Sequence, residues 1–272
     1  ISLVKNSFYR DSSGSKELLD VFFTSSEFKD TEFWIGKYNI SSNFNHILTT
    51  RGPGQSIFNT QLSSASQNTY LEDMTGTYTV EYANGDIDKI SKTLDATSAI
   101  PGYKPAVTDD SGNYYVDGGV GAPTPGTSLS NVIVDYALNT APDGDKFHIF
   151  YVIGPKYIDE DIENINPTYH WAKQIVKTTK SVLNFSIYRE RQLIFDSWIK
   201  MTGNTIYTDA FSYQRVTGTG LKAFLDSINN RHYFVTCYSD SDSIDIVSFD
   251  RSDLEKEYKK SFDNAFFEIF YI

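Results

Sequence analysis

The segment Tyr-Tyr-Val-Asp-Gly-Gly-Val at residues 114–120 constrains the fold more than any other part of the chain. Tyr115 and Val116 are typical of the end of a buried strand, so we expect Asp117 where a strand stops and a loop begins. In open α/β sheets, ligands bind at this edge. Gly118 and Gly119 lack a Cβ atom, which permits a sharp turn and the close approach of another group. The segment predicts Asp117 as the site residue, with Gly118 and Gly119 as the site loop.

A second motif, Ala-Thr-Ser-Ala-Ile-Pro-Gly-Tyr-Lys-Pro, precedes this segment at residues 96–105. In this order the two motifs closely resemble the second half of the patatin-like phospholipases, which are serine acyl hydrolases with a Ser-Asp dyad. Residues 54–62, Gly-Gln-Ser-Ile-Phe-Asn-Thr-Gln-Leu, are similar to the family's segment before that half. The resemblance covers residues 50–155 and implies that Asp117 is the catalytic aspartate of the dyad.

The resemblance also implies a fold. It predicts one α/β domain over residues 1–272, with three layers and a mainly parallel sheet flanked by helices. Residues 156–272 would form a helical and mixed C-terminal extension. The family's glycine-rich oxyanion loop and its Gly-x-Ser-x-Gly nucleophile elbow are not found in this sequence. We therefore expect the N-terminal part of the fold, with the nucleophile, on an upstream segment.

Two functions of different classes follow from the resemblance. In the first, the chain supplies the aspartate of a phospholipase-like enzyme that degrades lipid esters, and an upstream partner segment supplies the serine and the oxyanion loop. In the second, the patatin-like scaffold is catalytically silent and serves as a structural or binding component of a larger assembly. Asp117 would then only cap the turn at Gly118. A fold alone does not decide between these functions.

Composition excludes several classes of function. A net charge of −11 and a pI near 4.8 disfavour nucleic-acid binding, which depends on clustered Lys and Arg, and disfavour adsorption to anionic membranes. Lipid remains a substrate if an apolar rim makes the contact. No run of about eighteen apolar residues is present, so we expect a soluble chain, either peripheral to a membrane or part of an assembly. No cofactor or metal is expected.

Hydrophobic periodicity predicts the remaining elements. The apolar run at residues 147–153 is typical of a strand covered on both faces, in which His148 is a core histidine and not a base. Cys237, the only cysteine, falls in a predicted buried strand and is expected to be a structural thiol. The expected strands are residues 77–82, 114–116, 147–153, 232–238 and 244–249, and the expected helices are residues 16–23, 86–96, 127–138, 221–228 and 253–269. Residues 167–201 are expected to form either two helices or one long one.

Two other patterns resemble ligand sites, one for calcium and one for phosphate, but each has a feature that disfavours the site. Asp240, Asp242 and Asp245 are spaced like calcium ligands, but the central glycine of an EF-hand loop is missing, which favours a solvated turn. The loop at residues 118–126 followed by a helix is compatible with a phosphate cradle. However, Pro123 and Pro125 remove two amides that such a cradle would use.

Overall fold

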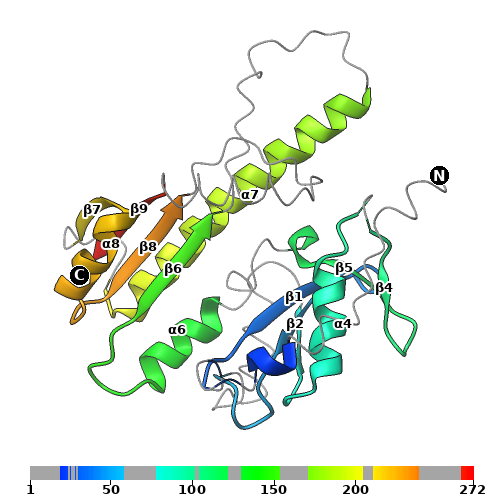
Figure 1. Ribbon diagram of the computed structural model, residues 1–272, viewed down its shortest axis with the longest axis horizontal. Coiled ribbons are helices and arrows are strands. Elements are labelled where there is room, and N and C mark those ends of the chain that lie inside the picture. The colour runs from blue at the N-terminus through cyan, green and yellow to red at the C-terminus, as the bar shows by residue number, and fades with distance from the viewer. Residues whose placement is uncertain are drawn as a thin grey trace. The chain divides into compact units, whose positions relative to one another are not determined.

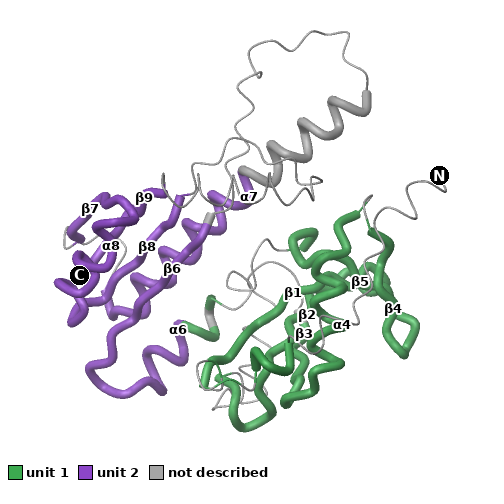
Figure 2. The backbone as a smooth tube through the Cα atoms, viewed as in Figure 1, with its two compact units in different colours: residues 1–133 green, residues 134–272 purple. Residues whose placement is uncertain are grey.

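The computed structural model describes residues 19–23, 25, 28, 30–57, 78–101, 104–121, 130–153, 171–204, 211–238 and 265–272. Contacts within the chain group it into two compact units, residues 1–133 and 134–272, which Figure 2 shows in different colours. Since two compact units can belong to one folding domain, the single domain over residues 1–272 stays a prediction.

The first unit contains a five-stranded sheet in the order β3-β2-β1-β5-β4. The turn at residues 40–43, with Asn43 at a φ of 61°, joins β1 and β2 as an antiparallel pair. β3 pairs with β2 in parallel, and β5 lies antiparallel to both β1 and β4. The strands are β1 (Trp34–Asn39), β2 (Phe44–Thr49), β3 (Tyr78–Tyr82), β4 (Val107–Thr108) and β5 (Tyr114–Asp117).

Helix α4 (Ile87–Thr97) covers one face of this sheet and lies against β1 and β5 in Figure 1. It begins at Asp86, whose carboxylate accepts a hydrogen bond from the Lys89 amide and so satisfies one free N–H of the first turn. Its buried Ile90 packs against Leu48. The predicted strand at residues 77–82 and the predicted helix at residues 86–96 are thereby confirmed.

The opposite face of the sheet is covered by the start of helix α6 (Ser130–Asn139). Val132 is buried against Ile47, with Trp34 and Val80 packed beside them. Burial of apolar side chains on both faces of β2 is the arrangement expected of a layered α/β unit.

The second unit contains a four-stranded sheet in the order β6-β8-β9-β7, between helices α7 and α8. On one face Trp198 and Ile199 of α7 pack against Phe234, and on the other face side chains of α8 pack around Val235 and Ile269. The elements are β6 (His148–Ile153), α7 (Trp171–Met201), β7 (Ser212–Thr217), α8 (Gly218–Ser227), β8 (Tyr233–Tyr238) and β9 (Phe266–Tyr271).

The fold class is α/β, with mixed sheets. Of the strand pairs in the described residues, β2–β3 and β6–β8 are parallel and the other five are antiparallel. The predicted predominance of parallel strands is not found in the described part of the chain. For β1–β2 and β4–β5 the physical reason is connection length, because turns as short as residues 40–43 and 109–113 can join only antiparallel neighbours.

The closing helix predicted at residues 253–269 is wrong at its C-terminal end, where β9 (Phe266–Tyr271) is observed. Phe270 packs with the cluster under α7, whereas Phe267 and Ile269 pack with the cluster under α8. A strand that is buried on both faces is apolar throughout, so its residues also fit a helical period. The rest of that predicted helix and the predicted strand at residues 244–249 lie outside the described residues.

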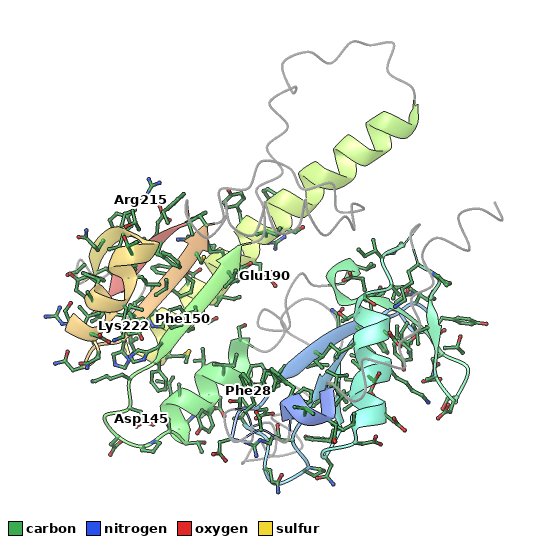
Figure 3. All side chains as sticks on the ribbon, in the orientation of Figure 1. Phe28, Asp145, Phe150, Glu190, Arg215 and Lys222 are labelled. Carbon is green, nitrogen blue, oxygen red and sulfur yellow. The ribbon has the colours of Figure 1, made fainter. Side chains whose placement is uncertain are left out.

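Strand β6 is observed as predicted, and among the described strands it lies at the edge of its sheet. Phe150, labelled in Figure 3, is 53% exposed, and Val152 is 71% exposed. His148 is exposed too; its ring stacks on Tyr233, with centroids 3.8 Å apart, and its Nε2 lies 3.0 Å from the Arg231 carbonyl oxygen. The expectations of a strand covered on both faces and of a core histidine are therefore wrong for the described part of the chain. Helix α8 packs mainly against β7 and β9, so the face of β6 that carries Phe150 and Val152 is left open in the described part of the unit.

The described helices include none that is both long enough and apolar enough to cross a bilayer.

Trp198 is the largest fully buried side chain of the second unit, and its Nε1 donates to the Phe147 carbonyl at 3.1 Å. We expect Trp198→Ala to lower the free energy of unfolding by about 3–5 kcal/mol, because it leaves a cavity and removes one of the two hydrogen bonds to that carbonyl, which also accepts from the Tyr233 amide. Tyr188→Ala, on the same helix but 42% exposed, is the control and should cost less than about 1 kcal/mol. Equal losses in chemical denaturation would contradict this packing.

Candidate functional site

Asp117 is the last residue of β5, at the end of the sheet where the sequence placed it. It lies opposite Lys37 of β1, and its backbone N–H donates to the carbonyl of Ala99 at 3.1 Å. Ala99 is fully buried and belongs to the motif at residues 96–105. The two motifs that carry the family resemblance are therefore joined by a hydrogen bond.

The carboxylate of Asp117 is held by its own turn. Its Oδ1 accepts a hydrogen bond from the Gly119 amide at 2.7 Å, which caps the 3₁₀ turn Gly118–Val120. Within the described residues this is the only hydrogen bond of the carboxylate, so Oδ2 has no partner there. The side chain is half-buried. The result is a carboxylate with a fixed orientation and one oxygen that makes no hydrogen bond with the described residues.

The glycines after Asp117 are required by close packing. A Cβ atom on Gly118 would lie 2.5 Å from the carbonyl oxygen of Gly36, and one on Gly121 would lie 2.5 Å from Cδ2 of Tyr38. Both distances are too short for carbon, so the turn can lie against β1 only if these positions lack a side chain. Gly118 and Gly119 belong to the 3₁₀ turn beside Asp117, and their role as the loop of a functional site stays a prediction.

The serine of the second motif has a structural role in the described residues. Ser98 caps the C-terminus of α4; its hydroxyl donates to the Asp95 carbonyl and accepts from the amine of Lys104 at 2.7 Å. The same amine donates to the Asp95 carbonyl at 2.9 Å, where a positive charge is favoured by the helix dipole. The described residues show no hydrogen bond between Ser98 and Asp117, so this serine is not brought to the carboxylate.

A polar cluster that the sequence did not predict lies on the face of the five-stranded sheet to which Asp117 belongs, since Lys37 of the cluster is the register partner of Asp117. Glu81 of β3 is bonded to Lys37 Nζ at 3.2 Å and to His46 Nδ1 at 2.8 Å. Burial alone would raise the pKa of Glu81, but the hydrogen bond from His46 and the charge and hydrogen bond of Lys37 outweigh it and lower the pKa to about 2. No local motif signals this cluster, because its members meet only through strand pairing.

The cluster reaches β5 through Tyr115, two residues before Asp117. The Lys37 amine lies 4.1 Å from the centroid of the Tyr115 ring, and the Tyr115 hydroxyl donates to Asp109 at 3.2 Å. Burial and the charges of Glu81 and Asp109 raise the pKa of Tyr115 to about 12, so the hydroxyl remains a donor at neutral pH. These contacts fix the strand that presents Asp117.

Cys237 and the aspartates at residues 240–245 are the remaining candidate residues from the sequence. Cys237 is half-buried on β8, and burial raises the pKa of its thiol, which disfavours a reactive thiolate. Asp240, Asp242 and Asp245 lie outside the described residues. In the part of the chain that the structure describes, no group of three or more His, Cys, Asp or Glu side chains is placed to hold a metal ion.

Gly118→Ala should destabilise the protein by about 1–3 kcal/mol, because the new methyl group meets the rigid backbone of β1. Gly220→Ala is the matched control: a Cβ there meets nothing closer than the Thr217 hydroxyl at 4.0 Å, within helix α8. Since alanine is favoured over glycine in helices, the control should be neutral or stabilising by up to about 1 kcal/mol. If thermal unfolding shows that both variants behave alike, the close packing at Gly118 is disproved.

Glu81→Gln should lower the free energy of unfolding at pH 7 by about 1–2 kcal/mol, allowing for solvent screening of a partly exposed pair. A carboxyl group whose pKa is lower in the folded state than in the unfolded state, where it is 4.5, stabilises the fold at pH values above 4.5. This contribution is lost as the pH falls towards about 2, the pKa of Glu81 in the folded state. The difference between Glu81→Gln and the parent should therefore shrink over that range. Asp110→Asn, in an ion pair whose carboxylate is 94% exposed, is the control and should show little effect.

Comparison with family models, with curated proteins and with solved structures finds no match to this chain. The patatin-like resemblance accordingly stays a prediction, resting on the motifs at residues 96–105 and 114–120.

Proposed function

We propose that this chain is the aspartate-bearing portion of a patatin-like acyl hydrolase that cleaves lipid esters with a Ser-Asp dyad. The observation that carries the proposal is the Asp117 carboxylate at the end of β5, with Oδ1 held by Gly119 and Oδ2 without a hydrogen bond in the described residues. A general base needs one oxygen that can accept a proton. A carboxylate that is already held in position can accept it without first reorganising. The three-layer arrangement of that family belongs to the same proposal.

The chemistry assigned to Asp117 is proton transfer. Its Oδ2 takes the proton of a serine hydroxyl as the serine oxygen attacks the ester carbonyl carbon. As the tetrahedral intermediate collapses, the same proton passes to the departing alcohol, which leaves an acyl-serine and an ionised Asp117. Water then enters, gives its proton to Asp117, and releases the fatty acid with return of that proton to serine. The serine and the amides that hold the oxyanion belong, in this proposal, to an upstream segment.

The contacts around Asp117 support this role through positioning. Its main chain is held by Ala99 on one side, and Gly118 lies against the backbone of β1 on the other. Correct placement of a base within hydrogen-bond reach is a large part of its effect on rate. A carboxylate on a flexible loop would lose that advantage.

A second function, a catalytically silent scaffold, is favoured by one observation. The single hydrogen bond of the Asp117 carboxylate among the described residues comes from Gly119 in its own turn. An aspartate that only caps a tight turn makes this same bond. In this alternative the chain would act as a structural or binding component of an assembly.

Asp117→Asn separates the two functions. Asparagine keeps an oxygen that can accept from the Gly119 amide, so the turn is retained, but it is too weak a base to take the serine proton. In the protein that contains the upstream segment, we expect kcat for ester hydrolysis to fall by about 10²–10⁴-fold with KM little changed.

Asp110→Asn is the matched control, an exposed carboxylate in the turn before β5 that should leave hydrolysis unchanged. Hydrolysis that survives Asp117→Asn, in a variant whose thermal unfolding matches the parent, would rule out the dyad and leave the scaffold function.

A further inference from the structure

Phe147 is the residue at which the chain enters the second sheet, and its main chain is held by hydrogen bonds from several elements. Its carbonyl accepts from Trp198 Nε1 on α7 at 3.1 Å and from the Tyr233 amide on β8 at 3.2 Å. Its amide donates to the ring Nδ1 of His232 at 3.0 Å. These bonds fasten the end of the segment at residues 140–147, which joins α6 to β6, to the core of the second unit.

The hydrogen bond to His232 exists in only one protonation state of the ring. A backbone amide can only donate, so Nδ1 of His232 must be the unprotonated nitrogen of a neutral imidazole. In the protonated ring both nitrogens carry hydrogen, and Nδ1 would face the Phe147 amide as a second donor. Protonation therefore replaces this hydrogen bond with a repulsive contact between two donors. The rings of Phe147 and His232 are stacked, with centroids 5.4 Å apart, which keeps the imidazole in this orientation.

The groups around His232 favour the neutral ring. Burial is the largest cause that lowers the pKa of His232 below its ordinary value of 6.5, and the positive charges of Lys146 and protonated His148 lower it further. From β9 only main chain reaches this residue, where the Ile272 amide donates to the His232 carbonyl at 3.0 Å. The other charged side chains of the segments that meet here are exposed and, in the described residues, make no hydrogen bond with the ring: Asp143, Asp145, Lys200 and Arg231.

The other two histidines of the described residues do not have this property. His46 Nδ1 lies 2.8 Å from the Glu81 carboxylate, so a proton on that ring strengthens the contact. His148 Nε2 lies 3.0 Å from the Arg231 carbonyl oxygen, which can only accept, so this nitrogen carries hydrogen in either state of the ring. Among the described histidines, only His232 accepts a hydrogen bond that its own protonation removes.

We infer that the hydrogen bond between Phe147 and His232 is an acid-sensitive latch, which holds the segment at residues 140–147 on the second sheet while the ring is neutral and releases it when the ring is protonated. The inference does not depend on the proposed function, since it applies equally to a hydrolase and to a scaffold. The Phe147 carbonyl accepts from Trp198, so release of this residue also loosens a contact of the core under α7.

The sign of the pH dependence follows from the lowered pKa of His232. Because that pKa is lower in the folded state than in the unfolded state, the unfolded chain takes up the proton first as the pH falls below 6.5. The contribution of the latch to stability is complete above 6.5 and is lost as the pH falls through the lower pKa of the folded state. Acid therefore opens the latch, and neutral pH closes it.

The test is an NMR titration of the whole chain, labelled with ¹⁵N, from about pH 8 to about pH 5. Long-range nitrogen–proton spectra report which ring nitrogen of His232 carries hydrogen, and at the start of the titration this should be Nε2. As the ring takes up its proton, at a midpoint below 6.5, the protection factor of the Phe147 amide, corrected for the intrinsic pH dependence of exchange, should fall at least about tenfold.

Two variants separate the latch from a general effect of acid. In His232→Asn the side-chain oxygen can accept from the Phe147 amide but does not titrate, so the protection of that amide should stay constant over the same range. Lys146→Gln removes a neighbouring positive charge and should move the midpoint of release to higher pH. Lys222→Gln, at an exposed lysine paired with Asp226 on α8, is the matched control and should leave the midpoint unchanged.

Several results would overturn the inference. Hydrogen on Nδ1 of the neutral ring would show that it does not accept from Phe147, and a ring that stays neutral until the whole chain unfolds would show that the latch never opens. Constant protection of the Phe147 amide through the titration of His232, or the same loss of protection in His232→Asn, would remove the link between the two residues. If His232→Asn does not fold, equal midpoints in Lys146→Gln and the parent would still contradict it.

Discussion

The hydrogen bond from the Asp117 amide to the Ala99 carbonyl, 3.1 Å long, is the interaction on which the candidate site depends. It joins the end of β5 to the segment that follows α4, two parts of the chain with a polar turn between them. Gly118 can then lie against the backbone of Gly36 only because it has no side chain. The junction thereby holds the main chain of Asp117, which carries the carboxylate and begins the turn at Gly118.

Local signals were sufficient to predict much of this region from the sequence. The strand at residues 77–82, the helix that begins after Asp86 and the end of β5 at Asp117 depend on alternation, capping and glycine, which act over a few residues. The turn at Gly118 and Gly119 was predictable for the same reason. The hydrogen bond between Asp117 and Ala99 was not predicted, because it joins two segments that are separated by the polar turn at residues 108–113.

Features set by distant partners were not predictable in this way. Whether Phe150 is buried depends on which helix covers that face of β6, and an apolar run looks the same in both cases. The same ambiguity led to the wrong assignment of β9, whose side chains are buried on both faces. The cluster around Glu81 exists only through the pairing of β1, β2 and β3, so no segment of sequence contains its signature.

The central claim is that Asp117 activates a serine carried by an upstream segment. Labelling of that serine by a fluorophosphonate, followed by mass spectrometry of the protein containing both parts, tests it most directly, because the reagent reacts with an activated serine whatever the natural ester. The account predicts rapid labelling of one serine and labelling slowed by about 10²-fold or more in Asp117→Asn. Equal rates in the two proteins, or no labelled serine in the parent, would contradict it.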